Sequence, residues 1–131
     1  RELLDGLDLY TVHSSLDSHP LTVYGIHSEN IHDEKTANPD GKLRRPVLLL
    51  HGRTWSAVPV YHLLGGPKNA AKDIPGRESR SLMEEMYDAG LQPYTMDFRG
   101  FGGTPHDESQ CVEPNLCASD TECVLKFIAD R

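Results

Sequence analysis

The sequence contains no long apolar segment and no concentration of positive charge. Its longest apolar run, Val47 to Leu50, is four residues long, whereas a transmembrane helix needs about 20. Thirteen lysines and arginines are scattered among twenty aspartates and glutamates, which gives a net charge of −7. Because nucleic acids and anionic membrane surfaces are bound largely through clustered lysines and arginines, we expect neither a nucleic-acid partner nor a membrane partner.

Cysteine is scarce, and the three cysteines present, Cys111, Cys117 and Cys123, lie close together. Their spacing lacks the paired C-x-x-C of a zinc site. An odd number leaves at least one thiol unpaired within the chain. A local Cys111–Cys117 disulfide and buried or free thiols both fit this pattern. The clustering points towards a secreted or periplasmic location, with a cytoplasmic one left open.

One further group of potential metal ligands lies in a polar segment that ends in the turn sequence Asn38-Pro39-Asp40-Gly41. We interpret this segment as a solvated loop rather than a metal site, and we expect no metal and no cofactor. The residues are His27, Glu29, His32, Asp33 and Glu34.

The first half of the chain predicts three strands. Residues 7–13 and 21–27 alternate in character and are joined by a polar turn, which indicates an antiparallel hairpin. The apolar run from Val47 to Leu50 ends abruptly at His51-Gly52, a pattern typical of a strand buried on both faces of a parallel sheet. Residues 53–80 then form a long connection rich in proline and glycine.

The second half predicts two helices with a strand between them. Ser81 and Glu84 form a capping-box pattern, and Gly90 is placed to end that helix. Residues 93–98 indicate a strand. Ser119 and Glu122 form a second capping-box pattern. The apolar faces of the two helices are Leu82, Met83, Met86 and Tyr87, and Cys123, Val124, Phe127 and Ile128. Strands that alternate with helices predict the α/β class.

Two linked motifs in this order resemble the α/β-hydrolase superfamily. One is the apolar strand ending at His51-Gly52, and the other is Asp97–Thr104, which is similar to the D-x-R-G-x-G-x-S/T segment after the fourth strand of that family. The resemblance spans residues 7–131. It implies that residues 1–131 are the N-terminal portion of a single hydrolase domain, in which an antiparallel hairpin leads into a parallel sheet flanked by helices, with strand order 1-2-4-3.

The resemblance also implies where an active site lies. In this family the loop after the third strand donates a backbone N–H to the oxyanion of the transition state, and losing such a donor costs about 3 kcal/mol. The amides of Arg53 and Thr54 are the expected donors. Trp55 either walls the acyl pocket or packs in the core. His51 and Gly52 border the substrate site, His51 chiefly by shaping the loop.

Asp97, Arg99, Gly100 and Gly102 are expected to be structural. A charge pair or backbone hydrogen bonds would brace the glycine-rich exit from the strand, and a catalytic carboxylate is the weaker alternative. A phosphate-binding loop is excluded, because the dinucleotide spacing G-x-G-x-x-G is absent and no helix follows at once.

No serine lies in the G-x-S-x-G elbow that presents the nucleophile of a serine hydrolase. The resemblance therefore implies a serine-type hydrolase of a small carboxylic ester, with an amide as second choice, that is inactive until the C-terminal half of the domain joins as a second chain. Epoxide hydrolases and haloalkane dehalogenases, which use an aspartate nucleophile, are one alternative. A non-catalytic binding module is another. Residues 47–50 would form an open sheet edge prone to aggregation.

Overall fold

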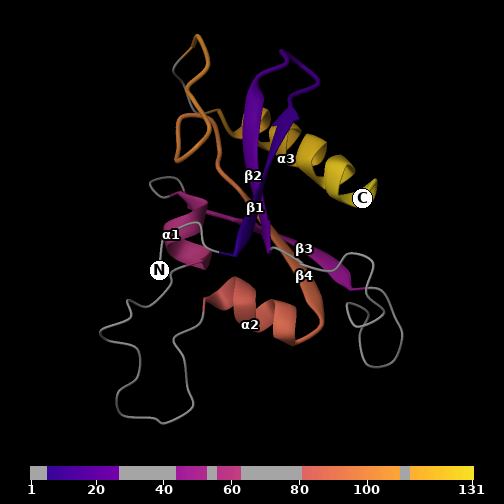
Figure 1. The fold of residues 1–131 in the computed structure, drawn as a ribbon. Helices are drawn as coiled ribbons and strands as arrows, with labels where there is room; N and C mark the ends of the chain where they lie inside the picture. Colours follow the sequence, from indigo (N-terminus) through magenta and orange to yellow (C-terminus); the bar gives the residue numbers. More distant parts are fainter. Residues whose placement is uncertain (1–5, 27–43, 53–55, 63–80, 110–112) are drawn as a thin grey trace.

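The computed structural model describes residues 6–26, 44–52, 56–62, 81–109 and 113–131, and these contain a mixed four-stranded sheet. The strands are β1 (Leu7–His13), β2 (Pro20–Ile26), β3 (Arg45–Leu50) and β4 (Leu91–Met96). Their order is β1-β2-β4-β3 (Figure 1). β2 is antiparallel to both β1 and β4, whereas β3 runs parallel to β4. The α/β class and the strand order agree with the prediction.

Within the described residues, no helix combines the length and the apolar character that crossing a membrane would require.

The hairpin and the fourth strand are shifted slightly from their predicted positions. β2 begins one residue earlier than predicted, with Pro20 opposite His13, and the predicted last residue, His27, lies outside the described residues. β4 begins directly after Gly90, whose φ of 93° ends the preceding helix in a conformation that suits glycine. The predicted last residue of this strand, Phe98, lies outside it, because its N–H donates to the side chain of His51.

In the described residues, three helices cover the sheet, and one of them was not predicted. Helix α1 (Ala57–Tyr61) lies within the stretch expected to be a long connection. Helix α2 (Leu82–Asp88) has the predicted capping box, in which Ser81 Oγ accepts from Glu84 N–H and Glu84 Oε1 accepts from Ser81 N–H. Met83 is fully buried as expected, but Leu82 is exposed, so the predicted apolar face was wrong at that position.

Helix α3 (Pro114–Ala129) begins six residues before the start predicted with Ser119 as N-cap. The second capping box was wrong, because Ser119 lies inside the helix. Pro114 occupies the first turn, where its fixed φ suits a helix and its missing N–H needs no partner. The predicted buried stripe is confirmed by Val124 and Ile128, which are buried against the sheet.

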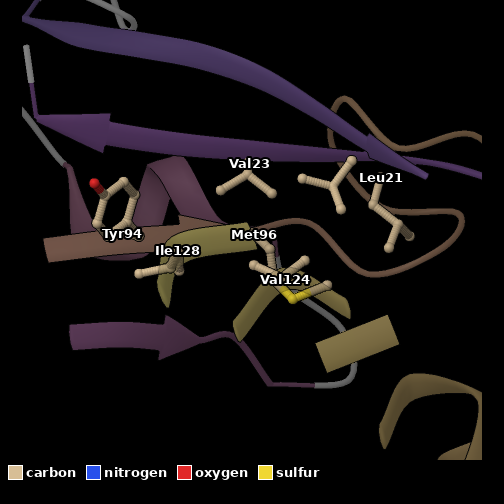
Figure 2. Packing of buried hydrophobic residues seen from close by; sticks show 7 residues of the cluster. Leu21, Val23, Tyr94, Met96, Val124 and Ile128 are labelled. Carbon is tan, nitrogen blue, oxygen red and sulfur yellow. The ribbon is translucent and has the colours of Figure 1, made fainter. Parts of the chain in front are cut away.

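The helices pack on opposite faces of the sheet (Figure 1). On one face α3 completes the main core, in which side chains from three strands meet those of the helix (Figure 2). On the other face α1 and α2 contact β4 and bury Val58 and Met83. The core of the first face consists of Val12, Leu21, Val23, Tyr94, Met96, Val124 and Ile128.

The apolar strand β3 is less buried than its sequence predicts. None of its residues is buried, and Leu50 is 42% exposed. β3 is last in the strand order, so among the described residues only β4 pairs with it. The prediction of a strand covered on both faces was wrong for this structure, whereas the prediction of an apolar strand at the sheet edge is confirmed.

Candidate active-site junction

The exits of β3 and β4 lie together at one end of the sheet. The two strands are parallel, and Leu50 is level with Met96. The residues that follow, His51 and Asp97, therefore leave the sheet side by side. The carboxyl ends of parallel strands are the usual location of functional sites in α/β proteins, so this junction is the candidate site.

His51 fixes the exit of β3 to the exit of β4. It is buried, and its Nε2 accepts a hydrogen bond of 3.0 Å from the N–H of Phe98. The ring is therefore the tautomer whose Nδ1–H donates to the carbonyl of Gly52, at 2.7 Å. The rings of Phe98 and Phe101 contact the imidazole edge-on, at 4.9 and 5.3 Å. With both ring nitrogens engaged, His51 holds the exit of β3 against the residues that follow β4, and its expected role in shaping the substrate loop stays a prediction.

Asp97 binds three separate parts of the chain. Its carboxylate is buried; Oδ1 accepts from the N–H of Ala57 at 2.7 Å, and Oδ2 accepts from the N–H of Gly103 at 2.9 Å and the hydroxyl of Tyr24 at 2.7 Å. Burial, followed by the hydrogen bond to Asp97, raises the pKa of Tyr24 well above its usual value. Of the two bracing interactions considered from the sequence, Asp97 makes the backbone hydrogen bonds, and Arg99 pairs with other carboxylates.

The glycine-rich turn wraps closely around the Asp97 carboxylate. Gly102 has a φ of 51°, and a Cβ added there would lie 2.2 Å from Asp97 Oδ2. Gly100 has a φ of 79°, and a Cβ there would lie 2.4 Å from the ring of His106. Thr104 Oγ1 closes the turn by donating to the carbonyl of Asp97, at 2.8 Å. Both predicted structural glycines are therefore required by backbone conformation and by close approach.

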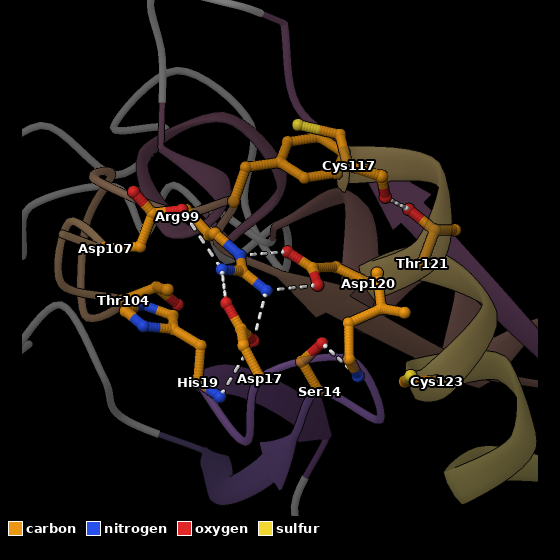
Figure 3. Close-up of polar contacts among 12 residues, drawn as sticks. Ser14, Asp17, His19, Arg99, Thr104, Asp107, Cys117, Asp120, Thr121 and Cys123 are labelled. Atoms are coloured by element: carbon orange, nitrogen blue, oxygen red, sulfur yellow. Dashed lines mark hydrogen bonds and ion pairs between the residues drawn. The ribbon is translucent and has the colours of Figure 1, made fainter. Parts of the chain in front are cut away.

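Arg99 is held by three aspartates (Figure 3). Asp120 on α3 binds it through two hydrogen bonds, Nε to Oδ2 at 2.7 Å and Nη2 to Oδ1 at 2.9 Å. Asp17, in the turn between β1 and β2, accepts from both Nη atoms, and Asp107 accepts from Nη1 at 3.1 Å. These bonds engage all five N–H donors of the guanidinium. We call this group the Arg99 clasp.

The charges of the Arg99 clasp stabilise one another. The hydrogen bonds that Arg99 donates to Asp120 and then to Asp17 raise the pKa of Arg99. The hydrogen bond from Arg99 holds the pKa of Asp17 well below its usual range, although burial opposes the shift. The pKa of Asp107 is also lowered, first by a hydrogen bond from Ser109 and then by Arg99. Arg99 is therefore a structural cation that ties α3 to two loops.

A buried hydrogen bond joins the end of α1 to the start of α2. His62 is the C-cap residue of α1, and Ser81 is the N-cap residue of α2. The Nδ1 atom of His62 lies 2.8 Å from the Oγ atom of Ser81. Both side chains are buried, and Ser81 also accepts from the N–H of Glu84. This serine therefore serves as a helix cap within a closed hydrogen-bonded group. The sequence identified Ser81 as a cap but gave no reason to select His62.

Several predicted site residues lie outside the part of the chain that the structure describes. They include the expected oxyanion donors Arg53 and Thr54, the expected pocket residue Trp55, and the acidic and histidine group that starts at His27. Gly52 is described and is exposed at the end of β3. Among the described residues, no group of histidines, cysteines, aspartates and glutamates could hold a metal ion.

The cysteines carry no disulfide in the described helix. Cys117 and Cys123 are both free thiols, whereas Cys111 lies outside the described residues. Burial raises the pKa of Cys117, which disfavours the reactive thiolate. Cys123 lies 3.4 Å from both the backbone nitrogen and the hydroxyl oxygen of Ser15, and so joins α3 to the turn between β1 and β2.

Fold and junction together define an α/β protein in which two parallel strands end at a buried, hydrogen-bonded carboxylate and a glycine-rich turn. A search against protein-family models and a search of curated proteins both found no match.

Proposed function

We propose that this chain is the N-terminal portion of an α/β-hydrolase domain that hydrolyses a small carboxylic ester, or an amide, through a serine nucleophile. The observation that carries the proposal is the junction of His51-Gly52 with Asp97 and Phe98. It combines the two motifs of the resemblance, 46 residues apart between His51 and Asp97, in a sheet with the strand order expected for that family.

The proposed role of this chain is to supply part of the oxyanion hole. Acyl transfer places negative charge on the carbonyl oxygen of the substrate, and preorganised backbone N–H groups stabilise that charge. The amides of Arg53 and Thr54 are the proposed donors. The described residues on both sides of them support this role, because Gly52 is held through His51 and Ala57 is held by Asp97.

The nucleophile, the acid and the base of the triad are proposed to come from outside these 131 residues. No serine here lies between two glycines in the required spacing. The edge of β3 offers a place for the C-terminal half of the domain, because Leu50 is exposed there and the described residues leave one side of the strand unpaired. We propose that a strand of that half, on a second chain, pairs with β3.

The proposal is tested on the protein as isolated from its source, with any accompanying polypeptide retained. A fluorophosphonate probe should label a serine outside residues 1–131, and the same preparation should hydrolyse p-nitrophenyl acetate. Prior labelling should abolish the hydrolysis. If neither polypeptide is labelled, the serine mechanism is wrong. Turnover of an epoxide or haloalkane without labelling would then indicate an aspartate nucleophile, and no turnover of any of these substrates would indicate a binding module.

A further inference from the structure

Three segments that are distant in the sequence meet at the two residues that follow β4. The exit of β3 is bound through His51 Nε2, which accepts from Phe98 N–H. The start of α1 is bound through Ala57 N–H, which donates to Asp97 Oδ1. The glycine-rich turn is bound through Gly103 N–H, which donates to Asp97 Oδ2. A single buried carboxylate therefore sets the distance between α1 and the turn.

We infer that Asp97 is a positioning residue for the proposed reaction, an assignment that rests on the proposed function. Only four residues of sequence separate Gly52 from Ala57. His51 anchors the first end of this short stretch and Asp97 anchors the second, both to the exit of β4. Asp97 is not itself a reacting group, because its two oxygens are already occupied by two backbone amides and a hydroxyl.

The chemistry of this position requires a group that only accepts hydrogen bonds. Ala57 and Gly103 each present a backbone N–H, which can only donate, to opposite oxygens of Asp97. An asparagine has one oxygen and one NH2 group, so whichever way its amide is turned, one backbone N–H faces another donor. Asp97→Asn therefore keeps the shape of the side chain and removes one of the two anchors.

The first test measures kinetics and amide exchange on the full protein. In Asp97→Asn, kcat per active site, counted by fluorophosphonate titration, should fall about 10²-fold, the effect of losing one oxyanion donor, while KM stays within a factor of three. Exchange of the Ala57 or Gly103 amide, followed by NMR, should be at least tenfold faster.

Thr95→Val is the matched control, because it removes a hydrogen bond from β4 to the carbonyl of Leu49 without touching the junction. It should lower Tm and leave kcat per site unchanged.

A second variant covers the case in which Asp97→Asn does not fold. Ala57→Pro deletes the N–H that donates to Asp97 and leaves the carboxylate in place. The first helical position accepts proline, and Ser56 before it is extended, with φ −112° and ψ 163°, as a residue preceding proline requires. This variant should also lower kcat per site with little change in KM.

The outcomes separate the two proposals. The positioning role is overturned if Asp97→Asn keeps the wild-type kcat per site, or if both amides exchange in it at the wild-type rate. Where only Ala57→Pro folds, a wild-type kcat per site in that variant overturns the role. If the wild-type protein shows neither hydrolysis nor labelling, the proposed function fails. Amide exchange then decides by itself whether Asp97 fixes the start of α1 and the turn.

Discussion

Arginine is the residue that the clasp requires, because no other side chain offers five donors in a fixed plane. Arg99 is 2% exposed and uses all five on Asp17, Asp107 and Asp120. A lysine has three donors on one atom and cannot bind two carboxylates side by side. Removing the cation would leave the fully buried Asp120 without its counter-charge, a defect that typically costs about 3–5 kcal/mol.

Acid should weaken the clasp through Asp17. Because Arg99 holds the folded pKa of Asp17 below its unfolded value of about 4, the stabilisation is complete above that value and is lost as the pH falls through the folded pKa. Asp17→Asn should therefore have a lower free energy of unfolding at pH 7, and the gap to wild type should narrow between about pH 5 and pH 2. Urea titrations across this range measure the gap. A gap that stays constant with pH would show that Asp17 contributes no charge-dependent stability.

At the residue scale, the sequence identified the structural glycines and the backbone-binding role of Asp97, because both follow from a local motif. It did not identify the partners of Arg99. Asp17 is 82 residues away in an ordinary polar turn, and Asp120 lies within the second predicted capping box. Contacts of this range depend on how the hairpin and α3 pack, and no local pattern contains that information.

At the element scale, two serines with similar sequence contexts have different positions. Ser81 caps α2 through its hydroxyl, whereas Ser119 lies inside α3, which Pro114 begins. A capping box is a local signal, and a proline upstream can start the helix earlier. Elements with strong periodicity were predicted, whereas the short helix α1 was not, because it has only five residues and one of them is Pro59.

Substituting the two serines distinguishes a cap from a helix interior. Ser81→Ala should lower the free energy of unfolding by about 1 kcal/mol, because Glu84 N–H loses its acceptor. Ser119→Ala should be neutral or slightly stabilising, because alanine is the better residue inside a helix. Urea unfolding of the two variants gives the comparison. Equal losses for both serines would contradict the assignment of the helix starts.

At the scale of the whole molecule, the sheet has an apolar edge. Leu50 on β3 and Val60 on α1 are each 42% exposed, and α1 contacts β3. An exposed apolar edge strand is a site for pairing with another chain. The sequence predicted this edge because the resemblance placed the third strand beside a strand that these residues do not supply.

Residues 1–131 expressed alone should be insoluble or molten, and co-expression with the proposed C-terminal half should restore a cooperative thermal transition. Leu50→Lys should increase the soluble fraction of the isolated chain, because a charge on an edge strand opposes association. Leu125→Lys is the control, since Leu125 on α3 is 50% exposed but lies on no sheet edge. Soluble yield, dye binding to apolar surface and thermal melts measure the effect. A soluble, cooperatively melting isolated wild-type chain would contradict the prediction.

The Arg99 clasp also sets an order of events during synthesis. Asp17 leaves the ribosome 82 residues before Arg99, and Asp120 follows 21 residues after Arg99. Contacts between distant residues form late, because loop closure must precede them. The hairpin can therefore form early while its turn carries an unmatched acidic group, and the full set of contacts to that turn forms only when α3 has been translated.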